Sequence, residues 1–340
     1  MSSRMLEEAL AAPDCVARQL AADARRYADL GHTLRHTPLT SALTLARGSS
    51  DHAANYCAYL IMARLGRVVA SLPMSLLTLN QAPLHARDTL AIAISQSGQS
   101  PDIVDTLRYF RAGGATTIAL VNAAGSPLAR AAEWAMPLHA GTEHSIAATK
   151  SFIASLVAGA RLVAHWQGDP VLQDALAALP EGLRAATRCD WSGAIEALAP
   201  ARNIMVVGRG IGFPVALEAA LKLKETSALQ AQAFSGAEIR HGPMALVEAG
   251  YPLLIFATRG PTQAGLLQLA RELRACGARV LLAAPDNVAG RDLSLPSAAT
   301  PDLDPILAVQ AFYVMAAALA AARGRDPDRP RHLSKVTRTH

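Results

Sequence analysis

Residues 89–100 read Thr-Leu-Ala-Ile-Ala-Ile-Ser-Gln-Ser-Gly-Gln-Ser, and Pro101 follows them directly. The apolar run Thr89–Ile94 predicts a β-strand, and the polar loop that begins at Ser95 marks its end. Ser100 can cap a helix and Pro101 suits the first helical turn, so we expect a helix from Pro101. A strand, a short polar loop and a helix in this order are typical of a parallel α/β sheet.

The same order recurs along the chain on both sides of this segment. In the first half we expect strands at Ala42–Arg47, Thr89–Ile94 and Thr116–Val121. In the second half we expect strands at Ile204–Val207, Leu253–Ala257 and Arg279–Ala283. Glycine-containing loops follow the first two strands of each half, and helices follow those loops. The repetition indicates a parallel sheet in each half.

One constant difference in residue number relates the two halves of the sequence. Aligning Arg47 with Arg209 also places Ser95 on Ala257 and Gly98 on Gly260. We therefore predict an α/β fold with two tandem doubly wound parallel-sheet domains, flavodoxin-like or Rossmann-like sandwiches. The predicted intervals are a helical segment of one or two helices at 1–36, a first domain at 37–180, a second domain at 190–324 and a C-terminal tail at 325–340, with the linker near 179–190.

Composition narrows the class of function. The chain has 340 residues, a net charge of +5 and a pI near 9.2. No basic stripe with interleaved aromatic residues occurs, which argues against nucleic acid and suits a pocket for an anionic metabolite. The four scattered cysteines argue against a disulfide framework and a zinc site and suit a reducing cytosol. The N-terminus lacks a signal-peptide core, and the most apolar stretch, Phe152–Ala164, is too short to span a bilayer. We expect a cytoplasmic protein with no metal, cofactor or membrane partner.

The loop from Ser95 to Ser100 is the strongest candidate for a binding site. It follows a predicted parallel strand, where open α/β sheets bind ligands. Its hydroxyl groups and the backbone N–H groups of a helix N-terminus suit a phosphate, and Ser50 ends the neighbouring strand. An ordinary serine–glycine turn with a cap is the alternative. The corresponding loop of the second half, 258–262, lacks the serines, so we expect one phosphate site per chain.

Lysine is rare in this sequence, because only four of the 32 basic residues are lysines: Lys150, Lys222, Lys224 and Lys335. Where arginine serves elsewhere, a lysine suggests a position that needs a titratable amine. A neutral lysine amine can form an imine with a carbonyl carbon, and a guanidinium cannot. The alternative is chance survival in an arginine-biased genome.

The segment Pro214–Leu229 predicts an apolar helix that carries two lysines and two glutamates. Glu218, Lys222 and Glu225 are spaced four and three residues apart, so they share one face of the helix. Alanine and leucine surround them, which predicts that the helix is largely buried. A buried carboxylate beside a lysine suits proton transfer. A surface stripe of salt bridges would have the same spacing.

A loop histidine and a tail lysine complete the candidates. His241 lies in a glycine–proline loop, where an exposed imidazole can act as an acid or a base. An incidental loop histidine is the alternative. Lys335 lies in a tail that can fold over a cleft and exclude water. A frayed, charged chain end is the alternative.

Five motifs together resemble a known family: Ser95–Gly98 after a strand, Gly141–Glu143 followed by Ala147–Lys150, Ala220–Glu225, Glu238–Pro243, and Pro330–Lys335. In this order they resemble the double sugar-isomerase (SIS) region of glutamine–fructose-6-phosphate aminotransferase, the glucosamine-6-phosphate synthase. The resemblance covers nearly the whole chain. It implies two SIS domains, a homodimer with shared active sites and a hexose 6-phosphate ligand.

The resemblance also implies roles for particular residues. Glu225 would move a proton between C1 and C2 of the sugar with the help of Lys222. His241, supplied by the neighbouring subunit, would open the sugar ring, and Lys335 would form an imine with the ketose carbonyl. The residues implied in phosphate binding are Ser50, Ser95, Gln96, Ser97 and Ser100.

Three departures from the synthase pattern modify this interpretation. The chain shows no N-terminal glutaminase, Ala148 stands where the synthase has a serine that contacts a sugar hydroxyl, and the end reads Lys335-Val-Thr-Arg-Thr-His. These departures resemble SIS-type glucosamine-6-phosphate deaminases, so we expect conversion of glucosamine 6-phosphate to fructose 6-phosphate and ammonia. Galactosamine 6-phosphate as substrate, an aldose–ketose phosphosugar isomerase, an ammonia-dependent synthase and a non-catalytic sugar-phosphate sensor remain alternatives.

Overall fold

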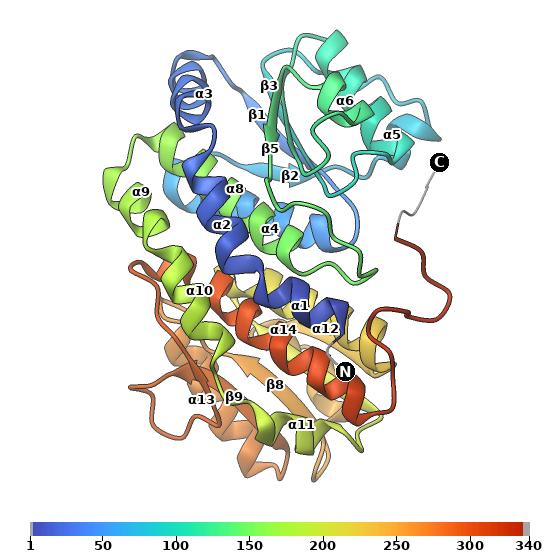
Figure 1. The fold of residues 1–340 in the computed structure, drawn as a ribbon, viewed down its shortest axis with the longest axis vertical. Helices are drawn as coiled ribbons and strands as arrows, with labels where there is room; N and C mark the ends of the chain where they lie inside the picture. The colour runs from blue at the N-terminus through green and yellow to red at the C-terminus, as the bar shows by residue number, and fades with distance from the viewer. Residues whose placement is uncertain (1–2, 336–340) are drawn as a thin grey trace. The chain divides into compact units, whose positions relative to one another are not determined.

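The computed structural model describes residues 3–335 and divides them into two units that are each discontinuous in sequence. The N unit comprises residues 14–143, 150–177 and 334–335, and the C unit comprises residues 3–13, 144–149 and 178–333. Each unit contains one parallel sheet with helices on both faces (Figure 1). The predicted α/β class with a doubly wound sheet in each half is confirmed.

The sheet of the N unit has the strand order β2-β1-β3-β4-β5. Its strands are β1 (Ser41–Leu45), β2 (Val69–Ser71), β3 (Thr89–Ser95), β4 (Thr116–Val121) and β5 (Trp134–Pro137). All neighbouring strands run parallel. The strand order changes direction between β1 and β3, and this switch point is where doubly wound sheets bind ligands.

Helices cover both faces of this sheet. The helices are α2 (Ala12–Ala21), α3 (Ala24–His36), α4 (Ser49–Leu65), α5 (Ser75–Thr78), α6 (Pro101–Ala112), α7 (Pro127–Ala131), α8 (Lys150–Gln167) and α9 (Pro170–Ala177). Alternate residues of the strands, such as Leu43, Leu45 and Ala91, pack with Leu107 and Phe110 of α6 in one core. Helices α3, α4 and α8 pack together as a second layer. Burial on both faces explains why β3 is apolar at nearly every position.

The sheet of the C unit repeats this order as β10-β9-β8-β6-β7. Its strands are β6 (Asn203–Gly208), β7 (Gln230–Ser235), β8 (Pro252–Phe256), β9 (Arg279–Pro285) and β10 (Leu293–Leu295). Its helices are α1 (Arg4–Leu10), α10 (Leu179–Thr187), α11 (Ser192–Leu198), α12 (Phe213–Ser227), α13 (Gln263–Ala275) and α14 (Asp304–Ala322). Helix α13 packs on one face of the sheet through a core that includes Leu266 and Leu273, and α12 and α14 pack together as the other layer. Its switch point lies between β6 and β8.

The offset read from the sequence relates corresponding elements of the two units. It carries the start of β1 at Ser41 onto the start of β6 at Asn203. It also carries the start of α6 at Pro101 onto the start of α13 at Gln263. The two units are therefore structural copies of one doubly wound fold.

Two expectations about local structure were wrong, the number of N-terminal helices and the position of the most apolar stretch. The N-terminal segment forms three helices, because the chain turns at Ala11 and again at Asp23, which adopts a left-handed conformation. Residues 179–190, expected as the linker, are mostly the helix α10 with Pro180 in its first turn, and the two units divide beside it, between Ala177 and Ala178. The most apolar long helix is the one spanning Pro301–Ala322, which is long and apolar enough to cross a membrane. Because 78% of its most apolar window is buried inside the protein, it has the character of a core helix.

Candidate functional site

The loop after β3 is held in a tight turn by its own serines. Ser95 ends β3, and its Oγ accepts the Gly98 N–H at 3.0 Å. The Ser97 Oγ accepts the Gln99 N–H at 3.3 Å. Gly98 has a φ of 61°, and a Cβ on it would lie 2.2 Å from the Ser126 Oγ. Only glycine therefore fits at this position.

Two helices begin at this edge of the N sheet. Ser100 is the N-cap residue of α6, and Ser50 lies in the first turn of α4, which follows the neighbouring strand β1. Gln96 and Ser97 are half-buried, so their polar groups remain accessible. Burial raises the pKa of the Asp51 carboxyl next to Ser50, and electrostatic interactions with His52 and Arg47 oppose that rise. The expected residues thus gather at the switch point of the sheet, and phosphate binding there stays a prediction.

Helix α12 carries a buried chain of charged groups. Lys222 Nζ contacts Glu225 Oε2 and lies 3.5 Å from Glu218 Oε1. The side chains of Lys222 and Glu218 are 1% and 0% exposed, so the surface stripe of salt bridges is excluded. Tyr313 on α14 donates its hydroxyl to Glu218 Oε1 at 3.0 Å. The sequence analysis did not identify Tyr313, because its partner lies on another helix.

At one end of this row of charged groups, Glu225 lines a cavity. The Glu225 side chain is 17% exposed. With Leu221 and Lys224 it lines a cavity of about 720 Å³, and residues 324–326 and 329–333 line the same cavity. The cavity volume suits a small metabolite. This part of the tail therefore lies beside Glu225 in the C unit.

His241 lies in an exposed loop of the C unit. It follows a 3-10 turn, Glu238–Arg240, and precedes Gly242, whose φ is 132°. Its backbone N–H binds the Glu238 carbonyl at 2.9 Å. Among residues 3–335, no hydrogen bond or ion pair of the imidazole is found. The ring is exposed, as expected, and its role in ring opening stays a prediction.

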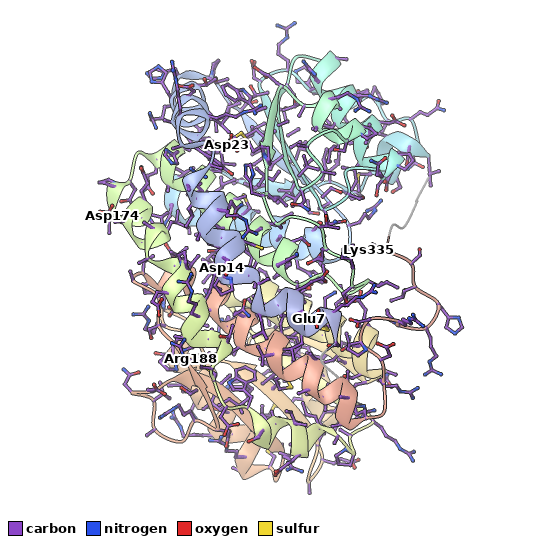
Figure 2. All side chains as sticks on the ribbon, viewed as in Figure 1. Glu7, Asp14, Asp23, Asp174, Arg188 and Lys335 are labelled. Atoms are coloured by element: carbon purple, nitrogen blue, oxygen red, sulfur yellow. The ribbon has the colours of Figure 1, made fainter. Side chains whose placement is uncertain are left out.

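Lys335, labelled in Figure 2, is held in the N unit by a buried carboxylate. Its Nζ lies 3.1 Å from Glu143 Oε2, and the Glu143 side chain is 0% exposed. The same carboxylate accepts the Ser151 N–H at 3.1 Å and the Ser151 hydroxyl at 2.5 Å. Glu143 is thus a functional candidate that the sequence analysis quoted only as part of a motif. The expected features at Val336–His340 lie outside the described residues.

Ala148 lies in the segment 144–149, which belongs to the C unit. Its side chain is half-buried. The segment is fastened by Glu8 on α1, whose carboxylate accepts the His144 N–H and, at 3.1 Å, the Ser145 N–H. Nothing in the sequence around Glu8 indicated this contact, since more than 130 residues separate the partners. The contact of Ala148 with a sugar stays a prediction.

The chain belongs to the SIS domain family, whose profile matches residues 40–164 and 197–291. Glutamine–fructose-6-phosphate aminotransferase (isomerizing) from Zymomonas mobilis is 33% identical over 311 residues, which are 86% of this chain and 51% of that enzyme. The chain thus spans about half the length of the curated relatives that it matches.

Solved structures show the same fold. A candidate phosphosugar isomerase from Silicibacter pomeroyi is 40% identical, with a TM-score of 0.91, over 96% of this chain and 100% of that one. Glucosamine-6-phosphate deaminase from Thermotoga maritima has a TM-score of 0.80 over 99% of this chain and 100% of that one. At 22% identity, the second likeness concerns the fold alone.

Proposed function

We propose that this protein is an isomerising glucosamine-6-phosphate deaminase, which converts glucosamine 6-phosphate and water to fructose 6-phosphate and ammonia. The observation that carries the proposal is the buried contact between Lys222 and Glu225, whose carboxylate lines a cavity of about 720 Å³. A carboxylate held beside a cation in an apolar helix suits proton transfer between adjacent carbons. Similarity to the aminotransferase and to the candidate isomerase supports a phosphosugar as the substrate.

Substrate binding would begin at the switch point of the N sheet. There the hydroxyl and backbone N–H groups at the start of α6 accommodate a phosphoryl group, because they supply donors at the positive end of a helix. The residues proposed to contact the phosphate are Ser50, Ser95, Gln96, Ser97 and Ser100. Ala148 is the residue proposed to contact the sugar, and its methyl group leaves more room than a serine.

Isomerisation would follow ring opening. His241 protonates the ring oxygen as the ring opens to the aldehyde form. Glu225 removes the proton from C2 and returns it to C1, which converts the 2-amino aldose to a ketose imine. The Lys222 ammonium stabilises the negative charge that develops on the C1 oxygen during this transfer. No redox change occurs in these steps.

Ammonia would leave from C2. Water adds to the imine carbon and ammonia departs, which leaves the ketone of fructose 6-phosphate. Alternatively, the Lys335 amine first displaces ammonia, and water then releases the ketose from Lys335. Glu143 supports the second route, because its buried carboxylate holds the amine of Lys335 in one place.

A second candidate function is aldose–ketose isomerisation of a phosphosugar without loss of nitrogen. The 40% identity to a candidate phosphosugar isomerase favours it. The same proton transfer by Glu225 would serve this reaction, with a hydroxyl in place of the amine. The two candidates differ in one product, ammonia.

The test is incubation of the purified protein with glucosamine 6-phosphate while ammonia and fructose 6-phosphate are measured. We expect both products in equal amounts, and their loss in Glu225→Gln. Glu196→Gln, an exposed glutamate of the same unit, is the matched control and should remain active. A folded protein that forms no ammonia but interconverts glucose 6-phosphate and fructose 6-phosphate would refute the deaminase in favour of the isomerase. Galactosamine 6-phosphate is assayed in parallel, and the substrate that releases ammonia faster is the preferred hexosamine.

The proposal includes a homodimer in which His241 acts in the partner's site. The exposed imidazole, with no bond to the described part of its own chain, supports this arrangement. His241→Ala and Glu225→Gln should each be inactive alone and regain activity when combined in one heterodimer, because one of the two sites then has both groups. Verified heterodimers without activity would place both groups in the site of a single chain.

A further inference from the structure

The switch point of the C sheet presents unbalanced positive charge where the N sheet does not. In the N unit, Arg47 at the end of β1 pairs with Asp102 in the first turn of α6, at 3.1 Å between Nη2 and Oδ2. The offset between the two copies places Arg209 on Arg47 and Ala264 on Asp102. The second copy has therefore kept the arginine and lost its carboxylate partner.

Arg209 extends over the N-terminus of α13. One of its terminal nitrogens lies 3.7 Å from the position that a Cβ on Gly265 would occupy, in the first turn of that helix. Arg209 is exposed, and within residues 3–335 its guanidinium forms no ion pair. The first turn of α13 contains no acidic residue. A cation beside the positive end of a helix is electrostatically unfavourable unless an anion lies between them.

A buried hydroxyl lies at the same switch point. Thr258 follows β8 and is only 3% exposed. Among the described residues its hydroxyl has no hydrogen-bond partner. A Cβ built on Gly212, at the N-terminus of α12, would lie 3.3 Å from the Thr258 Oγ1. The hydroxyl thus points from the end of β8 toward the loop that follows β6, across the switch point.

Within residues 3–335 the neighbouring Arg259, unlike Arg209, has an ion-pair partner. Arg259 is fully engaged, because its Nε and Nη2 bind Asp304 at 2.8 and 2.7 Å. That ion pair raises the pKa of the Arg259 guanidinium. Arg259 therefore belongs to the scaffold of this loop, and Arg209 remains the available cation.

We propose that the switch point between β6 and β8 is a second oxyanion site, which binds the phosphoryl group of a small phosphorylated metabolite through Arg209, the Thr258 hydroxyl and the N–H groups at the start of α13. The sequence-based expectation of one phosphate site per chain considered serine hydroxyls alone. In the second copy, a guanidinium and one threonine replace the serine cluster. The site is distinct from the serine loop and does not depend on the proposed deaminase activity.

The test is the stoichiometry of phosphate binding, measured by calorimetry on the full chain with inorganic phosphate and, separately, fructose 6-phosphate. We expect two phosphates per native chain. Ala264→Asp should abolish one of them, because it restores the carboxylate that Arg47 has in the first copy. An aspartate in the first turn is favourable for a helix and Ala264 is exposed, so this variant should remain folded. Binding of fructose 6-phosphate but not of inorganic phosphate to this site would identify a phosphosugar as its ligand.

Three further variants separate this site from the serine loop. Arg209→Gln should weaken the same binding event by roughly 10- to 100-fold, as expected for loss of a charge-assisted hydrogen bond. Arg279→Gln, an exposed arginine at the opposite end of the sheet, is the matched control and should bind two phosphates. If Ser97→Ala leaves binding intact while Arg209→Gln removes it, the serine loop fails as a phosphate site and the present proposal stands. If Ala264→Asp and Arg209→Gln both bind phosphate as the native chain does, the proposal is overturned.

Discussion

Replacing Glu143 by glutamine should test whether the tail lysine is held by a buried carboxylate. The substitution keeps the size of the side chain but removes its charge and turns one acceptor oxygen into a donor group. In the native protein the carboxylate accepts both the N–H and the hydroxyl of Ser151 and contacts Lys335 at 3.1 Å. The amide of Glu143→Gln cannot accept all three, so at least one donor loses its partner.

The expected loss of stability in Glu143→Gln follows from the burial of the Glu143 side chain. The Glu143 side chain is 0% exposed, so one unpaired donor costs about 1–3 kcal/mol. The Lys335 side chain is 25% exposed, and a partly solvated ion pair contributes at most about 1 kcal/mol. We therefore expect Glu143→Gln to lower the free energy of unfolding by about 1–4 kcal/mol in total. Glu133→Gln, an exposed glutamate of the same unit, should change it by less than about 0.5 kcal/mol.

The assay is urea denaturation at pH 7 of the native protein, Glu143→Gln, Lys335→Met and the double variant. The double-mutant cycle should give a coupling energy of about 0.5–1 kcal/mol between the two side chains. Deaminase turnover should fall in Glu143→Gln even at saturating substrate, because the Lys335 amine is no longer positioned. A coupling energy of zero, with full activity in Glu143→Gln, would refute the reasoning.

Three other predictions concern single positions. Gly98→Ala should lower stability by about 2 kcal/mol or more and weaken phosphosugar binding, because its φ is 61° and the new Cβ meets the Ser126 Oγ; thermal unfolding and calorimetry measure both effects. Tyr313→Phe should cost about 1–3 kcal/mol, because it removes a hydrogen bond from the buried Glu218 carboxylate; unchanged stability on denaturation would contradict this. Burial first, and then two neighbouring arginines, lower the pKa of His165 from 6.5. Since the unfolded chain then takes up the proton first, stability should fall as the pH drops below 6.5, and His165→Gln should reduce that dependence in denaturation curves measured at pH 7.5 and pH 5.5.

The local signals in the sequence were sufficient for most of the fold. The apolar run at Thr116–Val121 is a strand with those same bounds, and the helix expected from Pro101 is α6. Such elements are predictable because their hydrophobic period and their flanking breakers are local properties. The helix within the linker expected near 179–190 was not predicted, because Pro180 lies in the first turn of α10, where proline is compatible with a helix.

The candidate site was predictable only in part. Lys222 and Glu225 share a helix, so their spacing alone placed them on one face, and the structure brings them into contact. The contact of Lys335 with Glu143 joins residues 192 positions apart, and neither side chain carries a local sign of the other. The role of Glu143 therefore became visible only through its buried hydrogen bonds.

The sequence by itself determined the class of fold, the duplication and the residue types able to bind phosphate or move a proton, since periodicity, offset and side-chain chemistry are written along the chain. Tertiary structure alone decided which charges are balanced. Arg47 and Arg209 follow equivalent strands, yet Arg47 pairs with Asp102 and Arg209 forms no ion pair within residues 3–335, because an ion pair depends on distances across the fold of each unit.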